Sequence, residues 1–98
     1  MELQVSQIEQ IRTYLKDKPI IKAYLFGSYV RGEANEQSDI DLLVELDYTQ
    51  KIGLKFVQWQ LDLEELLQKK VDLISENGVS KYIKPIIDKE KVLIFSVI

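Results

Sequence analysis

Residues 27–44 read GSYVRGEANEQSDIDLLV, and this stretch decides the fold that the 98-residue chain is expected to adopt. It opens with a Gly-Ser pair at the end of an apolar run, crosses a polar loop and closes with a second apolar run that carries Asp39 and Asp41. The β-prone residues in this second run favour an extended strand, in which residues i and i+2 share one face. The two carboxylates are therefore predicted to lie side by side.

Two like charges in a half-buried strand need a positive partner. Without one, Asp39 and Asp41 repel each other, and leaving either of them buried costs several kcal/mol. Mg²⁺ prefers oxygen ligands and usually takes only one or two carboxylates, while water and substrate phosphate oxygens complete its coordination. The pair is therefore a predicted magnesium site.

The Gly27-Ser28 pair predicts a contact with phosphate. It follows the apolar run at residues 20–26, which we interpret as a buried strand that ends in a turn. Glycine lets a phosphate approach the backbone closely, and a short helix over residues 28–31 points its first N–H groups and the Ser28 hydroxyl at the same space. A Gly-Ser pair on its own is usually only a turn, so this prediction depends on the nearby aspartates.

The loop between these two motifs holds further polar candidates. Arg31 is able to pair with a phosphate or with an acidic neighbour, and the sequence leaves both roles open. Gly32 is free to adopt a left-handed helix cap. Ser38 directly precedes Asp39 and is predicted to orient that carboxylate at the nucleotide site.

A third carboxylate stands in a similar setting, because Asp72 interrupts the short β-prone run KVDLIS at residues 70–75. If this run forms a strand beside the Asp39–Asp41 strand, the three acids converge. Three acids are able to hold two metal ions about 3.5 to 4 Å apart, one activating an attacking hydroxyl and one supporting the leaving phosphate. The predicted chemistry is in-line nucleotidyl transfer, with the alternative that Asp72 is only a solvated residue at a strand edge.

The combination G-S-x-x-R-G, a short spacer, S-D-I-D-L-L-V and a later V-D-L-I resembles the DNA polymerase β nucleotidyltransferase superfamily, in particular its minimal nucleotidyltransferase branch. The resemblance covers nearly the whole chain. It implies that Gly27 and Ser28 hold the triphosphate, that Asp39 and Asp41 ligate Mg²⁺, and that Asp72 completes the acidic triad.

Members of this branch are encoded as antitoxins beside a small helical ribonuclease toxin of the HEPN class, and they transfer AMP from ATP to a tyrosine of that toxin. The resemblance thus implies ATP as substrate, Mg²⁺ as cofactor and a HEPN toxin as partner. A second hypothesis is a binding module that neutralises its partner by occlusion, without chemistry. A third, adenylylation of a small molecule such as an aminoglycoside, is weaker because the chain offers no additional domain for a substrate cleft.

Composition agrees with one small enzyme domain over residues 1–98. The chain is 46% hydrophobic, its net charge is −3 and it has no Lys/Arg cluster, which argues against direct nucleic-acid binding. It has no cysteine and no histidine, so thiolate and imidazole chemistry are excluded and carboxylates must carry the reaction. No apolar run approaches about 18 residues and no basic-then-apolar leader is present, so we expect no membrane contact and a cytoplasmic location.

The remaining patterns predict an α+β fold, a mixed four-stranded sheet with helices packed on it. A capping box at Ser6 and Glu9 begins the first helix, which ends before Pro19. Asn77-Gly78 predicts a turn, and Pro85 predicts the start of a final helix. The other expected elements are a strand at 20–26, a short helix at 28–31, a strand from Asp39 to Val44, a longer helix at about 53–69, a strand around Asp72 and a strand at 92–95.

The long helix has two apolar stripes. At about 100° per residue, one stripe is expected to face the sheet; it contains Phe56, Trp59, Leu63, Leu66 and Leu67. A second, nearly opposite stripe consists of Leu54, Val57 and Leu61. A 98-residue monomer has little means of burying both, so the second stripe predicts a contact with a toxin or with a second copy of the chain.

Overall fold

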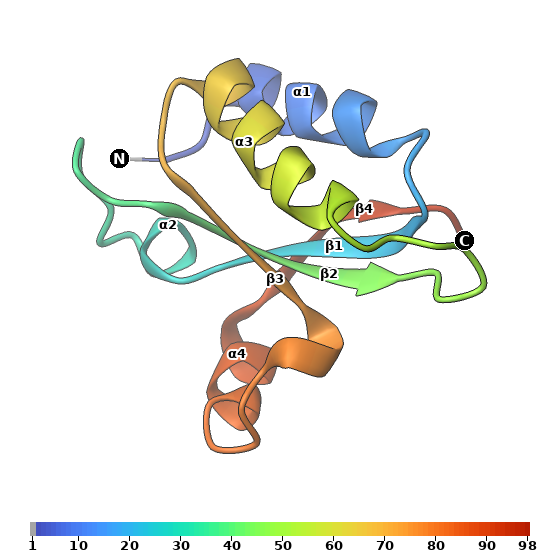
Figure 1. The fold of residues 1–98 in the computed structure, drawn as a ribbon. Helices are drawn as coiled ribbons and strands as arrows, with labels where there is room; N and C mark the ends of the chain where they lie inside the picture. Colours follow the sequence, from blue (N-terminus) through green and yellow to red (C-terminus); the bar gives the residue numbers. More distant parts are fainter. Residues whose placement is uncertain (1) are drawn as a thin grey trace.

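The computed structural model describes residues 2–98 and has the α+β architecture that the sequence predicts (Figure 1). In chain order the elements are α1 (Val5–Leu15), β1 (Ile20–Phe26), α2 (Ser28–Arg31), β2 (Ile40–Leu46), α3 (Lys55–Leu67), β3 (Val71–Ser75), the 3₁₀ helix η1 (Glu76–Gly78), α4 (Lys84–Glu90) and β4 (Val92–Ser96). Helices α1 and α3 cover one face of the sheet, and α4 lies on the other face (Figure 1).

The strands form one mixed sheet in the order β3-β2-β1-β4. Strand β1 pairs antiparallel with both β2 and β4, whereas β2 and β3 are parallel. Parallel neighbours need a crossover between them, and α3 provides it. This connection brings the run that contains Asp72 back beside the run that contains Asp41.

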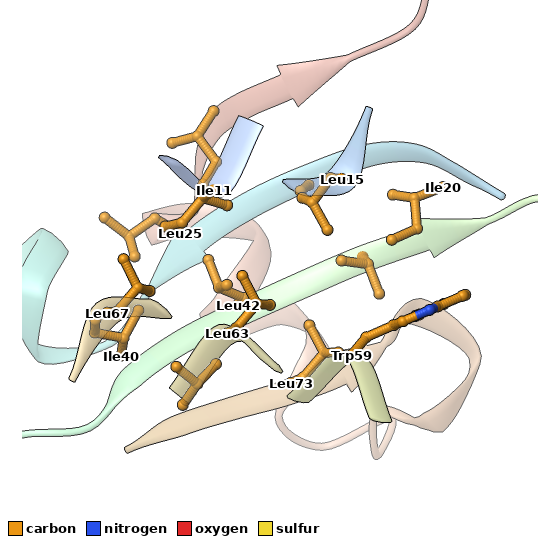
Figure 2. Packing of buried hydrophobic residues seen from close by; sticks show 14 of the residues in the cluster. Ile11, Leu15, Ile20, Leu25, Ile40, Leu42, Trp59, Leu63, Leu67 and Leu73 are labelled. Atoms are coloured by element: carbon orange, nitrogen blue, oxygen red, sulfur yellow. The ribbon is translucent and has the colours of Figure 1, made fainter. Parts of the chain in front are cut away.

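The main core lies between the sheet and the pair α1 and α3 (Figure 2). Alternate strand residues point into it, such as Leu42 and Leu73, and they meet Ile11, Trp59 and Leu63 from the helices. Full burial of one such side chain contributes about 1.5 to 3 kcal/mol. A smaller cluster on the opposite face consists of Phe26, Leu43 and Ile87, and it anchors α4.

Two details of the helices differ from the sequence prediction. The capping box of α1 was predicted wrongly: α1 begins after Gln4, whose N–H donates to Oε1 of Gln7 at 2.9 Å, so Ser6 lies inside the helix. On α3, Leu66 was expected to face the sheet, but its side chain is 39% exposed. Leu66 lies toward α1, where the two helices leave a groove instead of a closed contact.

The exposure of the second stripe is confirmed, although Leu54 is the N-cap of α3 and not a residue within it. Leu54, Val57 and Leu61 are 88%, 56% and 51% exposed. The predicted buried residues Trp59, Leu63 and Leu67 lie in the core.

The other predicted elements are present with small shifts of their ends. Strand β1 and helix α2 have the expected bounds, and Gly32 caps α2 in the left-handed region with φ of 74°. Strand β2 begins at Ile40, so Asp39 lies immediately before it. Helix α4 has Pro85 in its first turn, and η1 forms the turn at Asn77. Within residues 2–98, no helix combines the length and the apolar character that a membrane crossing requires.

Candidate active site

The acidic residues lie on the face of the sheet opposite α1 and α3. Side chains alternate along β2, so Ile40 and Leu42 enter the main core while Asp41 points to the other face. The parallel register pairs Asp41 with Asp72 on β3, and the antiparallel register pairs Asp41 with Phe26 at the end of β1. Asp41 is therefore central: it has Asp72 on one side and the start of the Gly-Ser turn on the other.

The electrostatics of Asp41 reflect this position. Burial, followed by the charges of Asp72 and Asp39, raises the pKa of Asp41 to about 6. The negative charges of the other two predicted acids therefore act on Asp41. Arg31 acts in the opposite direction and lowers the pKa of Asp41.

Gly27 has a specific reason to be glycine. Its φ is 82°, a region that residues with a side chain rarely adopt. A Cβ atom added here would overlap Oδ2 of Asp41. The turn after β1 therefore requires both the conformational freedom of glycine and the space that its missing side chain leaves for the Asp41 carboxylate.

Helix α2 begins directly after this glycine. The carbonyl of Gly27 accepts hydrogen bonds from Val30 N–H at 3.0 Å and from Arg31 N–H at 3.1 Å. At the other end, the carbonyl of Ser28 accepts a hydrogen bond from Glu33 N–H at 3.0 Å. The half-buried Ser28 is thus the first residue of α2, beside the turn that contacts Asp41.

Arg31 pairs with acidic neighbours, one of the two roles that the sequence left open. Its Nε donates to Oε1 of Glu33 at 2.7 Å, and its Nη1 donates to Oε2 of Glu90 at 3.0 Å. Glu90 also raises the pKa of Asp41, so it belongs to the electrostatic surroundings of the site. Sequence reasoning missed Glu90, because no local pattern marks an acid 59 residues away from its partner.

Ser38 supports the loop before β2. Its Oγ accepts a hydrogen bond from Asn35 N–H at 2.9 Å, and Asn35 Oδ1 accepts one from Gln37 N–H at 2.8 Å. Lys69 holds the same loop from outside by donating to the carbonyl of Glu36 at 3.2 Å. These bonds fix the approach of the chain to Asp39; the predicted contact of Ser38 with a nucleotide stays a prediction.

The position of Asp72 depends on α3. Strand β3 is at the edge of the sheet, where backbone N–H groups lack a neighbouring strand. Two side chains of α3 accept hydrogen bonds from these groups: Oε2 of Glu64 from Val71 N–H at 3.1 Å, and Oε1 of Gln60 from Leu73 N–H at 3.4 Å. Two side chains of α3 thus bracket Asp72 on its strand. No sequence pattern marks this contact between a helix and a strand edge.

The donor set suits a hard divalent cation. Across residues 2–98, no group of three or more acidic side chains is placed to hold an ion by itself. Mg²⁺ does not require such a group, since one or two carboxylates with water and phosphate oxygens complete its coordination. Burial, together with repulsion from Asp72 and Asp39, raises the pKa of Asp41, and a cation beside it would relieve this repulsion. The residues present therefore fit Mg²⁺ bound together with a phosphate substrate.

The family model of the nucleotidyltransferase domain matches residues 8–94. This chain belongs to that family. The match includes the Gly-Ser turn, all three acids and the strands β1, β2 and β3.

Curated relatives agree with this assignment. A protein of Methanocaldococcus jannaschii named "Putative protein adenylyltransferase" is 38% identical over 97 residues, which covers 92% of this nucleotidyltransferase and 97% of the relative. The protein adenylyltransferase MntA of Thermococcus cleftensis is 40% identical over 70 residues, covering 71% of this chain and 70% of that one.

Solved structures share the fold. A structure described as a "putative minimal nucleotidyltransferase" is 31% identical, with a TM-score of 0.78, and the match covers 94% of this chain and 95% of that one. The nucleotidyltransferase is therefore a member of the minimal branch. A chain from the complex of a tri-AMPylated Shewanella oneidensis HEPN toxin with its MNT antitoxin matches with a TM-score of 0.75 and 22% identity, covering 97% of this chain and 74% of that one.

Proposed function

We propose that this protein is a magnesium-dependent adenylyltransferase antitoxin, which transfers AMP from ATP to a tyrosine hydroxyl of a HEPN-class toxin and thereby neutralises it. The observation that carries the proposal is the strand register that sets Asp41 beside Asp72 and against Gly27. The names of the curated relatives support a protein acceptor, and the complex with an AMPylated toxin supports a toxin partner. We propose residues 1–98 as one catalytic domain.

In the proposed reaction, the tyrosine oxygen attacks the α-phosphorus of ATP, the bond from that phosphorus to the bridging oxygen breaks, and pyrophosphate leaves. Asp72 accepts the proton of the attacking hydroxyl, since it stands beside Asp41 with an exposed carboxylate. Gly27 and Ser28 hold the triphosphate, and Arg31 and Ser38 contribute to nucleotide binding. The placement of Gly27, Ser28 and Arg31 around one turn supports the first three roles, and the position of Ser38 directly before Asp39 supports the fourth.

Asp39, Asp41 and Asp72 are the proposed ligands of Mg²⁺, with two ions at the site. When bound, Mg²⁺ neutralises phosphate charge and favours the deprotonated form of an attacking hydroxyl. The three carboxylates would hold these ions through their oxygen atoms. Among these proposed ligands Asp41 has the central position, because it pairs with Asp72 on β3 and with Phe26 beside the Gly27 turn.

The exposed stripe on α3, formed by Leu54, Val57 and Leu61, is the proposed contact with the partner. It lies on the helix layer that covers the main core, away from the acidic face (Figure 1). Exposed apolar side chains at helical spacing are a common feature of protein interfaces. A contact here leaves the acidic face open to the acceptor tyrosine.

Replacing both Val57 and Leu61 with Asp tests this contact. We expect association with the toxin to be lost while the melting temperature stays within a few degrees of the original, because both side chains are more than half exposed. Val5→Asp is the matched control, since Val5 is an exposed apolar residue outside the stripe. Retained association in the double variant, measured by co-purification, would move the contact elsewhere.

The activity is tested by intact-mass spectrometry of the partner toxin after incubation with this protein, ATP and Mg²⁺. We expect the toxin to gain the mass of one or more adenylyl groups, and to gain nothing with an Asp39→Ala, Asp41→Ala double variant. The alternative function, neutralisation by occlusion, predicts that both proteins inhibit the toxin equally and that neither changes its mass. That result would overturn the transfer reaction.

A further inference from the structure

Arg31 is held by two carboxylates through different atoms of its guanidinium group. Nε donates to Glu33, which follows α2 in the chain, and Nη1 donates to both carboxylate oxygens of Glu90 at 3.2 and 3.0 Å. Arg31 itself closes the helix that begins at Ser28. The guanidinium group therefore lies between the loop that follows α2 and the end of α4.

The two acidic partners differ in their surroundings. The side chain of Glu33 is 62% exposed and stands in a polar loop, whereas that of Glu90 is 17% exposed. Glu90 is also fixed by its element, because Ile87 of the same helix is buried against Phe26 and Leu43. Solvent and salt compete with the bond to Glu33 far more than with the bond to Glu90.

The proposed nucleotide site explains why one bond should be exchangeable. Nε and Nη2 form one edge of the guanidinium group, and this edge binds a phosphate through two parallel hydrogen bonds. Glu33 accepts a hydrogen bond from Nε, which belongs to this edge. Glu90 accepts from Nη1, which lies outside the edge, so Glu90 does not compete with a phosphate for it. A phosphate is thus able to replace Glu33 without disturbing Glu90.

We propose that Glu33 occupies the phosphate-binding edge of Arg31 in the nucleotide-free protein and is displaced by ATP, while Glu90 holds Arg31 in place in both states. Glu90 is then a positioning residue for nucleotide binding, and Glu33 is a competitor of the substrate. The inference rests on the proposed function, because it assumes that the triphosphate binds at Gly27 and Ser28.

The two acids are expected to affect affinity with opposite signs. Glu33→Gln removes a competitor and should tighten nucleotide binding by about two- to fivefold, the range expected for an exposed ion pair. Glu90→Gln loosens Arg31 and should weaken binding by about fivefold or more. An effect of net charge alone would tighten binding in both variants, since removing either negative charge favours an anionic ligand.

The measurement is the dissociation constant of a non-hydrolysable ATP analogue with Mg²⁺, obtained by isothermal titration calorimetry at constant ionic strength. Glu36→Gln is the matched control, because it removes the same charge from the same loop and Glu36 is not a partner of Arg31. We expect Glu36→Gln to change affinity little. In an Arg31→Ala background, the effects of Glu33→Gln and Glu90→Gln should both disappear.

The outcomes separate the two proposals. Failure of the unsubstituted protein to bind the analogue would overturn the proposed function and this inference together. Two results would overturn this inference alone, provided that the unsubstituted protein binds the analogue normally. The first is that Glu33→Gln binds the analogue no more tightly than Glu36→Gln does. The second is that Glu90→Gln binds it more tightly than the unsubstituted protein does.

Arg31→Lys provides a second test that does not depend on the stability of the Glu90 variant. Lysine keeps the positive charge but lacks the planar fork, so it cannot hold Glu90 and a phosphate with two separate edges. We expect weaker binding of the analogue and no gain from adding Glu33→Gln. Unchanged affinity in Arg31→Lys would overturn the inference.

Discussion

At the residue scale, Gly27 and Asp41 depend on each other. Gly27 stands where a Cβ atom would meet the carboxylate of Asp41, and its φ is in the left-handed half of conformational space. Asp41 in turn is half-buried beside Asp72, so its carboxylate has little room to move. A substitution at Gly27 is therefore expected to displace the Asp41 carboxylate.

Gly27→Ala is expected to lower the free energy of unfolding by about 2 to 3 kcal/mol, through backbone strain and displacement of Asp41. Gly53→Ala is the comparison for a positive φ without a contact, because Gly53 has a φ of 49° and open space around its Cβ position, whereas Gly27, with φ of 82° and ψ of −153°, lies in a region that essentially only glycine adopts. Backbone strain alone should cost about 1 kcal/mol there. Equal losses in urea unfolding would mean that the contact with Asp41 contributes nothing.

The raised pKa of Asp41 predicts a pH-dependent stability of the metal-free protein. Because the folded pKa of about 6 lies above the ordinary value of 3.8, the unfolded chain releases this proton first, and stability is lost as pH rises from about 4 to about 6. Asp41→Asn removes this loss. After allowance for solvent screening, the variant should be more stable by the order of 1 kcal/mol above pH 6.

Thermal melts in EDTA at several pH values measure this difference directly. The two proteins should have the same stability near pH 3.5, and the difference should grow through the window and then level off. A difference that is constant with pH would show that the Asn side chain acts through packing and not through the charge of Asp41.

At the scale of elements, α3 both completes the core and closes the outer edge of β3. Glu64 and Gln60 accept hydrogen bonds from Val71 N–H and Leu73 N–H, the residues on either side of Asp72. The opposite stripe of the same helix, Leu54, Val57 and Leu61, is exposed. One helix thus positions an acid of the site with one side and offers an apolar surface with another.

Glu64→Ala should leave the N–H of buried Val71 without its partner and should destabilise the protein by about 1 kcal/mol. It should also weaken Mg²⁺ binding, because the strand that carries Asp72 loses a support. Glu65→Ala is the control on the same helix, since the Glu65 side chain is exposed. The same Mg²⁺ affinity in both variants would show that the hydrogen bond from Val71 N–H to Glu64 does not contribute to metal binding.

At the scale of the whole molecule, the two faces of the sheet have different tasks. One face is covered by α1 and α3 and contains most of the buried apolar residues (Figure 2). The other face carries Asp41 and Asp72 and is covered only in part by α4, through a cluster of three buried residues. The large core supplies the stability that the repelling carboxylates reduce.

Binding of Mg²⁺ and an ATP analogue should therefore raise the melting temperature of the whole domain. At a ligand concentration of about 100 times the dissociation constant, the gain is about 2.7 kcal/mol. For a domain of this size that corresponds to an increase of about 10 °C or more. The Asp39→Ala, Asp41→Ala double variant should show little change, and an equal increase in that variant would place the ligand elsewhere.

The sequence predicted the elements well and their contacts less well. Strand β1, helix α2, the Gly32 cap and the start of α4 at Pro85 are local features, set by residues a few positions apart. The predicted capping box at Ser6 was wrong because several polar residues near Val5 offer similar signals, and Gln4 forms the cap. The predicted burial of Leu66 was wrong because helical spacing does not show how far α1 extends over α3.

The α+β class, the Gly-Ser turn, the strands at Asp41 and Asp72 and the exposed stripe of α3 follow from the sequence alone, because periodicity and turn residues act over short distances. Three contacts follow from the fold: Asp72 stands in register with Asp41, Gly27 makes room for Asp41, and Glu90 reaches Arg31. These contacts join distant parts of the chain. They depend on strand register and on the packing of α3 and α4, which no local pattern encodes.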